Sequence, residues 1–276
     1  MTELEVESKM RKLDITEVQT LQLSLMKKIH SFMEENGIKY YLIAGSALGA
    51  MRHKGFIPWD DDIDIGLFRE DYERFLSVAT KFDPKYEIIN HRNAGNCDFC
   101  LTRIYIPNTK IDNPVIAKTG LDQRLYMDIF PLDNVPDSTD ERAIFEKKIK
   151  RRKSIIEKID VRNYRNTWLV LLCKSVISFI LKPNRNTIIS STESLMKTYD
   201  KQNTKAVCSL CSQYSFKKQV MLKSVYGTPT MYEFEKTSFY GPEKINVYLK
   251  TLYGSDYMEI PPIEKRRKGH DILMLE

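Results

Sequence analysis

Apolar residues recur along the chain with two different spacings, which predict an alternation of helices and strands. Residues 15–35 place apolar side chains three or four positions apart, a spacing typical of an amphipathic helix. Asp14 or Thr16 would cap the start of this helix, and Asn36-Gly37 would end it. By the same criteria, further helices are predicted at 69–82, 138–160 and 187–202, and within 239–253 one that begins at Pro242. Strands are predicted at 39–44, 86–90, 101–106 and 125–132.

Residues 44–66 concentrate small, basic and acidic residues in one segment. Gly45 would let the backbone approach a ligand closely, and Ser46 would offer a hydroxyl and an N-cap for a helix over 47–52. The N-terminus of a helix binds anions, and the run Arg52–Lys54 adds positive charge. The first half of the segment therefore predicts a phosphate-binding turn.

The second half of this segment is acidic, with aspartate at Asp60, Asp61, Asp62 and Asp64. In a strand, Asp62 and Asp64 would share one face while Ile63 and Ile65 enter the core. Two adjacent carboxylates repel each other, and the commonest reason to keep them together is a hard divalent cation. Beside a phosphate-binding turn they indicate phosphoryl or nucleotidyl transfer. The alternative is a solvated acidic turn or a calcium loop, but Ile65 stands where a calcium loop needs glycine.

Three segments resemble the LicD family of phosphotransferases, which is related to fukutin and lies within the nucleotidyltransferase superfamily. Arg52–Asp64 reads Arg-His-Lys-Gly-Phe-Ile-Pro-Trp-Asp-Asp-Asp-Ile-Asp and stands with Gly45-Ser46 as in the family signature. Asp128–Asp133 reads Asp-Ile-Phe-Pro-Leu-Asp, and residues 253–270 are similar to the family's C-terminal motif with Ser255 inserted. The family often has threonine where this chain has Ser46. The resemblance touches both ends and the middle of the chain.

The resemblance implies an α+β fold, with a small mixed β-sheet of the nucleotidyltransferase type flanked by helices. Residues 138–202 would be a helical insertion in a single domain over 1–276, since no repeat, linker or low-complexity segment interrupts the chain. The implied reaction transfers a phosphorylated small polar group, phosphocholine or similar, from a CDP-linked donor such as CDP-choline or CDP-ribitol. The acceptor would be a sugar hydroxyl of a cell-surface glycan or lipid-linked precursor, as in teichoic acid, lipopolysaccharide or capsule, and CMP would leave.

The same resemblance implies which carboxylates are catalytic. Asp62, Asp64 and Asp128 would hold one or two Mg²⁺ or Mn²⁺ ions. Asp128 lies in the middle of an apolar strand, where a charge is costly unless it has a function, and the superfamily places a third metal carboxylate on such a strand. Asp133 follows a proline and is expected in a turn or cap.

Several residues are candidates to bind the substrate. Gly45 and Ser46 would cradle a diphosphate. Arg52, His53 or Arg103 would neutralise charge that develops during transfer. Two interpretations of Trp59 remain: it packs beneath the site, or its ring faces a base or a quaternary ammonium group.

Composition leaves other functions to weigh. The 276 residues carry a net charge of +6, which suits an anionic nucleotide or membrane face and would equally suit nucleic acid. A nucleic-acid-binding protein predicts aromatics within a basic groove, but the basic run Lys147–Lys153 contains none and is typical of a solvated helix face. We therefore expect no nucleic acid partner. The other alternative is a nucleotidyltransferase that releases pyrophosphate, which would use the same metal site.

Location follows from the termini, the cysteines and one apolar segment. Met1–Arg11 is acidic and polar, so we expect no signal peptide, and five cysteines without an export signal indicate a cytoplasmic protein. Residues 168–181 are apolar but too few to span a bilayer. They would form either a helix packed on the core or an interfacial helix that makes the protein peripheral on the inner membrane face.

The cysteines also include two Cys-x-x-Cys pairs, Cys97/Cys100 and Cys208/Cys211. The pairs lie more than a hundred positions apart, far beyond the usual spacing of a zinc ribbon. Small buried core residues and a structural zinc site are the two interpretations.

Overall fold

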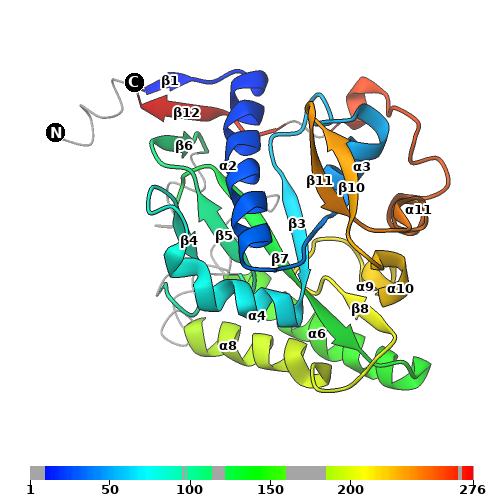
Figure 1. The fold of residues 1–276 in the computed structure, drawn as a ribbon. Helices are drawn as coiled ribbons and strands as arrows, with labels where there is room; N and C mark the ends of the chain where they lie inside the picture. The colour runs from blue at the N-terminus through cyan, green and yellow to red at the C-terminus, as the bar shows by residue number, and fades with distance from the viewer. Residues whose placement is uncertain are drawn as a thin grey trace.

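A mixed β-sheet forms the centre of the computed structural model, which describes residues 10–94, 97, 99–113, 122–159, 185–266 and 269–275. Its main strands, in spatial order, are β2 (Tyr41–Leu42), β3 (Asp64–Phe68), β7 (Tyr126–Val135), β5 (Thr102–Tyr105) and β4 (Glu87–Ile89), and β8 (Ala206–Cys208) and β9 (Val220–Leu222) extend it from the end of β7. β3 and β7 run parallel, and the other neighbouring strands are antiparallel. Figure 1 shows β3 and β7 side by side in the middle of the molecule. The α+β fold with a mixed sheet is confirmed.

Helix α2 (Ile15–Glu35) crosses the sheet, and its bounds match the prediction. Asp14 is the cap: its side chain accepts from the backbone N–H of Glu17, and the Glu17 carboxylate accepts from the N–H of Asp14. Such a capping box stabilises a helix by about 1 kcal/mol. On the buried face, the Gln22 amide donates to the carbonyls of Asp61 and Tyr126, so α2 ties the aspartate segment to β7.

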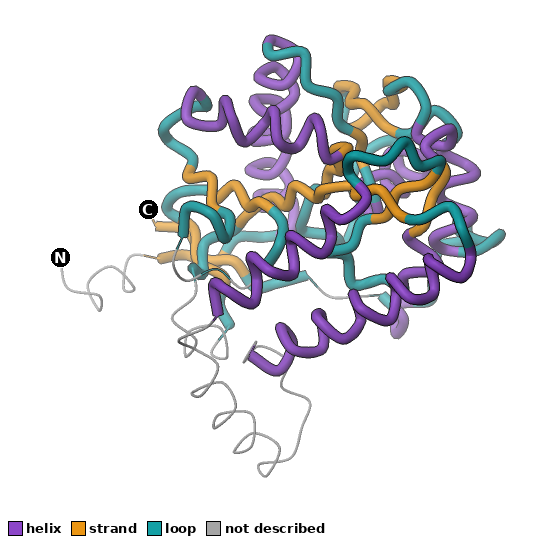
Figure 2. The backbone as a smooth tube through the Cα atoms, turned by 90° about the horizontal axis from the view of Figure 1, so that it is seen from below, coloured by secondary structure: helices purple, strands orange, loops and turns teal. Residues whose placement is uncertain are grey.

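The remaining helices lie around this sheet, as Figure 2 shows from below with helices in purple outside the orange strands. They are α3 (Ala44–His53), α4 (Arg69–Val78), α6 (Thr139–Ile159), α8 (Arg185–Met196), α9 (Phe216–Gln219), α10 (Lys223–Tyr226) and α11 (Ile245–Tyr253), with 3-10 turns at Ala79–Lys81, Lys197–Tyr199 and Ile263–Lys265. Within the described residues, no helix combines the length and apolar character that crossing a bilayer requires.

Within 138–202, predicted to be a helical insertion, the described residues form α6 and α8, which pack against each other. With β8 they enclose a second apolar core, separate from the main one, that contains Phe145, Ile149 and Ile189. The segment 168–181, for which a buried or membrane-facing helix is predicted, lies outside the described residues.

The C-terminal third contains strands that the periodicity did not indicate. β10 (Thr230–Phe234) and β11 (Thr237–Gly241) form a hairpin, and β12 (Ile272–Leu275) pairs with both β1 (Met10–Lys12) and β6 (Thr109–Ile111). The helix predicted within 239–253, with its start at Pro242, therefore begins three residues later than expected. Residues 239–241 pair within the hairpin, and the helix begins only at Ile245, after Lys244.

Strand β7 is longer than predicted, and this overturns the turn or cap expected at Asp133. β5 pairs with β7 only as far as Ile129, and β8 pairs with it only from Asp133 onward. Pro131 falls between these two neighbours, so on that side of β7 no ladder hydrogen bond is lost. The strand therefore continues through the proline, and Asp133 is fully buried inside it.

Candidate active site

Three charged residues form a row across three adjacent strands. Asp64 of β3 is the register partner of Asp128 of β7, and Asp128 is the register partner of Arg103 of β5. Neighbouring strands lie about 4.8 Å apart, so both carboxylates and the guanidinium project from one face at close range. The Arg103 Nε donates to Asp128 Oδ1 at 2.9 Å. Two residues predicted to be catalytic and one predicted to bind substrate thus meet at one place.

The alternation predicted for the aspartate strand is present. Ile63 and Ile65 are fully buried, while Asp62 is exposed and Asp64 half-buried, although β3 itself begins at Asp64. Burial and the charges of Asp62, Asp128 and Asp60 raise the pKa of Asp64 well above its ordinary value, and Arg103 opposes this. Carboxylates held together against their repulsion are donors that fit a hard divalent cation such as Mg²⁺.

Ser46 connects the turn to the aspartate strand but is not an N-cap. Helix α3 already begins at Ala44, after Ile43, so Ser46 lies inside its first turn. Its buried hydroxyl accepts from the backbone N–H of Asp64 at 2.8 Å. The residue thereby fixes the start of β3. Ala44, the first residue of the helix, has a positive φ of 46°, and its N–H donates to the Tyr248 hydroxyl.

Gly45 is placed where a side chain would strike an aspartate. A Cβ atom there would lie 2.7 Å from Asp60 Oδ2. Asp60, Asp61 and Asp62 have carboxylate oxygens within 4.8 Å of one another, the one such group of three potential metal ligands in the described chain. Asp64 lies outside this group. A side chain at residue 45 would therefore displace the Asp60 carboxylate from the start of α3.

Asp61 anchors the C-terminal tail rather than facing the site. Its Oδ2 accepts from the backbone N–H of His270 at 2.6 Å and lies 3.0 Å from the His270 Nδ1. Burial would raise the pKa of Asp61, but the hydrogen bonds from His270 outweigh it and the pKa is lowered. A Cβ atom on Gly269 would lie 2.9 Å from the Asp61 carboxyl carbon. The tail therefore closes tightly over the aspartate segment.

A cavity of about 770 Å³ opens over the row of charged residues. Asp62, Asp64, Asp128 and Arg103 line it together with Gly45. Its other walls come from segments distant in sequence, including Phe99, Tyr126, Phe130, Tyr214, Tyr253 and Tyr257. Such a polar and aromatic cavity has the size of a small-molecule site.

Arg52 and His53, two of the residues predicted to neutralise charge, already form contacts with other protein groups. The Arg52 Nη1 donates to the carbonyls of Tyr257 at 3.0 Å and Glu259 at 2.9 Å, and its Nε donates to His53 Nε2 at 3.0 Å. Burial and the neighbouring Arg52 lower the pKa of His53. Arg52 lines the cavity, whereas His53 is not among its lining residues and its ring lies beside Trp59.

Trp59 combines features of both interpretations. It is partly buried and packs against the main core, and it also lines the cavity. The guanidinium of Arg266 lies 4.3 Å from the centre of its ring. The protein thus supplies a cation to the aromatic face that was predicted to meet either the core or a ligand.

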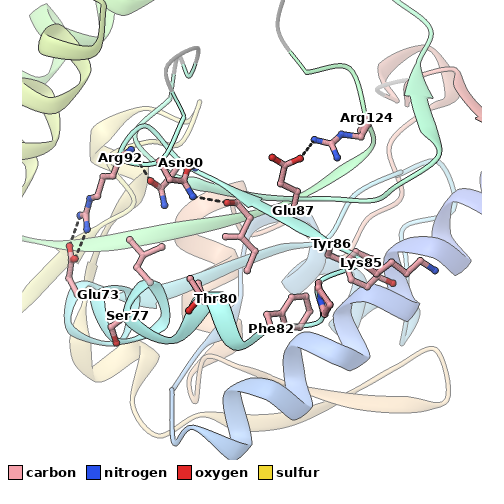
Figure 3. A pocket seen from close by; sticks show the side chains of 15 residues that line it. Glu73, Ser77, Thr80, Phe82, Lys85, Tyr86, Glu87, Asn90, Arg92 and Arg124 are labelled. Carbon is pink, nitrogen blue, oxygen red and sulfur yellow. Dashed lines mark hydrogen bonds and ion pairs between the residues drawn. The ribbon is translucent and has the colours of Figure 1, made fainter.

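A second cavity of about 850 Å³ lies along the outer edge of the sheet, between α4 and β4 (Figure 3). Four of its charged side chains form two ion pairs: Arg92 binds Glu73, and Arg124 binds Glu87. The Asn93 amide donates to the Ile88 carbonyl and so occupies part of the strand edge. This second cavity contains none of the predicted site residues. We therefore place the active site in the cavity over Asp64 and Asp128, although that cavity is the smaller of the two.

The two cysteine pairs come together in space. Cys211 donates to the Cys100 carbonyl at 3.1 Å, and the thiols of Cys97, Cys100 and Cys208 are buried. Burial raises the pKa of Cys211 to about 12. In the described part of the chain, these thiols do not form a group of three ligand atoms within metal-binding distance, and the packing matches the prediction of small core residues.

Sequence periodicity missed the residues that form the other wall of the cavity. Tyr214 and Tyr253 both line it, and their hydroxyls lie 3.1 Å apart. Lys265 and His270 also line it, from the C-terminal tail. The only sequence signal for these tail positions is the C-terminal motif over 253–270, since irregular segments carry no period.

Comparison with known proteins gives one match along almost the whole chain. The lipopolysaccharide cholinephosphotransferase LicD of Haemophilus influenzae is 30% identical over 270 residues, which cover 95% of this chain and 97% of that protein. A family model described as LicD/FKTN/FKRP, nucleotidyltransferase domain, matches residues 37–170.

Other relatives match over shorter lengths. An uncharacterized protein of Rickettsia typhi is 40% identical over 86 residues, or 31% of this chain and 28% of that protein. Human ribitol 5-phosphate transferase FKRP is 51% identical over 39 residues, or 14% of this chain and 8% of that protein.

Proposed function

The chain belongs to the LicD family of phosphotransferases, and from this premise we propose that it transfers a phosphorylated small polar group to a cell-surface glycan. The donor is CDP-linked, as in CDP-choline or CDP-ribitol, and the attacking group is a sugar hydroxyl of a glycan or lipid-linked glycan. The hydroxyl oxygen forms a bond to the transferred phosphorus and loses its proton. The bond from that phosphorus to the bridging oxygen of the diphosphate breaks, and CMP leaves with this oxygen.

The observation that carries this proposal is the row Asp64–Asp128–Arg103 at the base of the cavity. It brings paired carboxylates and one guanidinium to a site of suitable size, as phosphoryl transfer requires. The two named transferases among the relatives, one for cholinephosphate and one for ribitol 5-phosphate, agree with a phosphorylated small polar group.

Asp62, Asp64 and Asp128 are the residues we assign to Mg²⁺ or Mn²⁺. When bound, the ion would polarise the phosphoryl oxygens and stabilise negative charge in the transition state. Ser46 holds the first residue of β3 in place through its hydroxyl, and Arg103 orients Asp128. The ring centres of Phe99 and Tyr126 lie 4.1 Å and 3.9 Å from the central carbon of the Arg103 guanidinium, so the two rings restrict its movement.

The test is nucleotide release by purified protein with Mg²⁺, a panel of CDP-linked alcohols and a lipid-linked glycan extract. We expect CMP from one donor, and loss of this release in Asp62→Ala. Asp140→Asn is a matched control, because Asp140 is an exposed carboxylate at the start of α6, outside the cavity. Pyrophosphate release from CTP or ATP, with no CMP from any CDP donor, would instead identify a nucleotidyltransferase.

A further inference from the structure

The cavity carries more negative than positive charge. Its described lining residues include the carboxylates Asp60, Asp62, Asp64, Asp128, Asp256 and Glu259. The basic residues among them are Arg52, Arg103, Lys265 and His270. A diphosphate donor is itself an anion, so it must find cations here in addition to any metal ion.

Three of these four basic residues already have defined partners. Arg52 holds two backbone carbonyls of the tail and the His53 ring. Arg103 is paired with Asp128, and His270 contacts Asp61. Moving any of them to a phosphate would break a buried or half-buried interaction, which is costly.

Lys265 differs from the other three. Its side chain is exposed and lines the cavity, and its ammonium has no hydrogen-bond or ion-pair partner among the described residues. Its backbone N–H donates to the Pro262 carbonyl in the turn Ile263–Lys265, which fixes the point from which the side chain extends. A lysine ammonium on a flexible stem binds phosphate as a point charge without a rigid geometry.

The tail that carries Lys265 is fixed on both sides of it. Before it, Arg52 binds the carbonyls of Tyr257 and Glu259. After it, Arg266 donates from Nε to the Pro261 carbonyl at 3.0 Å and lies over Trp59. The backbone at Lys265 is thus held at the cavity while its ammonium stays available.

We propose that Lys265 binds the donor's diphosphate, and that Arg52 holds the tail in position for it instead of contacting phosphate. This assignment rests on the proposed function, because it presumes a nucleoside-diphosphate donor in this cavity. The ammonium donates to non-bridging phosphoryl oxygens and offsets the negative charge that the cavity and the donor share.

The test measures binding of Mg²⁺-pyrophosphate by calorimetry, together with the donor KM and kcat for CMP release. In Lys265→Met we expect pyrophosphate affinity to fall by about ten- to a hundredfold, as for a lost charge-assisted hydrogen bond. The donor KM should rise by a similar factor, and Lys265→Arg should restore most of both. Affinity should also lose part of its dependence on salt concentration, which a merely structural role would not change.

Lys250→Met is the matched control, because Lys250 is an exposed lysine of α11 that does not line the cavity. Wild-type pyrophosphate affinity in Lys265→Met would overturn the assignment, as would absence of binding to the wild-type protein. Weaker pyrophosphate binding in Lys265→Met, with no CMP released by the wild type from any CDP donor, would reject the proposed donor while supporting Lys265 as a phosphate ligand.

Discussion

Two aspartates five positions apart on β7 show how one strand serves two regions of the molecule. Asp128 faces the cavity and pairs with Arg103, with 16% of its side chain exposed. Asp133 faces the opposite side of the sheet, has no exposed surface, and accepts from Arg69 Nε at 2.7 Å. Arg69 also binds Glu193 of α8. Asp128 is the first residue of the Asp-Ile-Phe-Pro-Leu-Asp motif and Asp133 is the last, yet their surroundings differ completely.

The difference teaches that a charged residue in a buried strand is not by itself a sign of chemistry. An odd separation along a strand places side chains on opposite faces. Asp128 therefore meets a cavity and Asp64, whereas Asp133 joins a buried ion-pair network between α4, β7 and α8. The cost of burying Asp133 is offset by its guanidinium partner, and it links the main sheet to the second core.

The largest expected effect is on catalysis, from Asp128→Asn or Asp64→Asn. Each change removes a negative charge from the proposed metal site, so we expect CMP release to fall by at least about 10²-fold. Because like charges crowd this site, the midpoint of chemical denaturation should stay unchanged or rise. Normal turnover by Asp64→Asn would contradict the assignment of the metal site.

The corresponding change on the other face should act on stability. Asp133→Ala leaves Arg69 buried without its main partner, which costs about 3 kcal/mol in the free energy of unfolding. Denaturation by urea gives this value, and CMP release per folded molecule at low temperature should stay close to that of the wild type. A large loss of turnover without a loss of stability would mean that Asp133 belongs to the active site.

A smaller effect of opposite sign is expected at Asp200, which lies near Asp133. Burial and the charge of Asp133 raise the pKa of Asp200 to about 6, and its Oδ1 has no hydrogen-bond partner among the described residues. Because the folded-state pKa exceeds the ordinary value of 3.8, the folded protein binds more protons and stability falls as pH rises from 3.8 to about 6.

Asp200→Asn removes that dependence. The variant should be more stable than the wild type at pH 7, by about 1 kcal/mol after allowance for solvent screening. Unfolding measured at pH 4 and pH 7 provides the comparison, since the two proteins should differ less at the lower pH. Equal pH profiles for both would show that Asp200 keeps its ordinary pKa.

Much of the row Asp64–Asp128–Arg103 could be predicted because strands have a strict period of two. The alternation at 62–65 placed Asp62 and Asp64 apart from the core, and the apolar run around Asp128 indicated a central strand. Register between strands is a property of the fold, so only the structure brings Arg103 opposite Asp128. The resemblance to a family supplied what periodicity lacked, namely that these segments belong to one site.

The misses have physical causes. Pro131 suggested that the strand ends nearby, because proline has no N–H to donate to a neighbouring strand. This matters only where a neighbouring strand would accept that hydrogen bond, which the sequence does not show. Ser46 suggested a cap, but the helix begins at Ala44, three residues before the predicted start, and the Ser46 hydroxyl accepts from the N–H of Asp64 instead. The hairpin β10–β11 was missed because its mostly polar and aromatic residues share no clear apolar period.

The contact between Asp61 and His270 joins residues that are 209 positions apart, and β12 inserts between β1 and β6. The ribosome synthesises Asp61 long before His270. The aspartate segment of the nascent chain therefore exists before the C-terminal tail that encloses it. Folding during synthesis would therefore yield an open, incomplete pocket until residue 270 has emerged, and such late closure of distant contacts is slow. The nascent chain thus cannot form the finished cavity before synthesis has passed that residue.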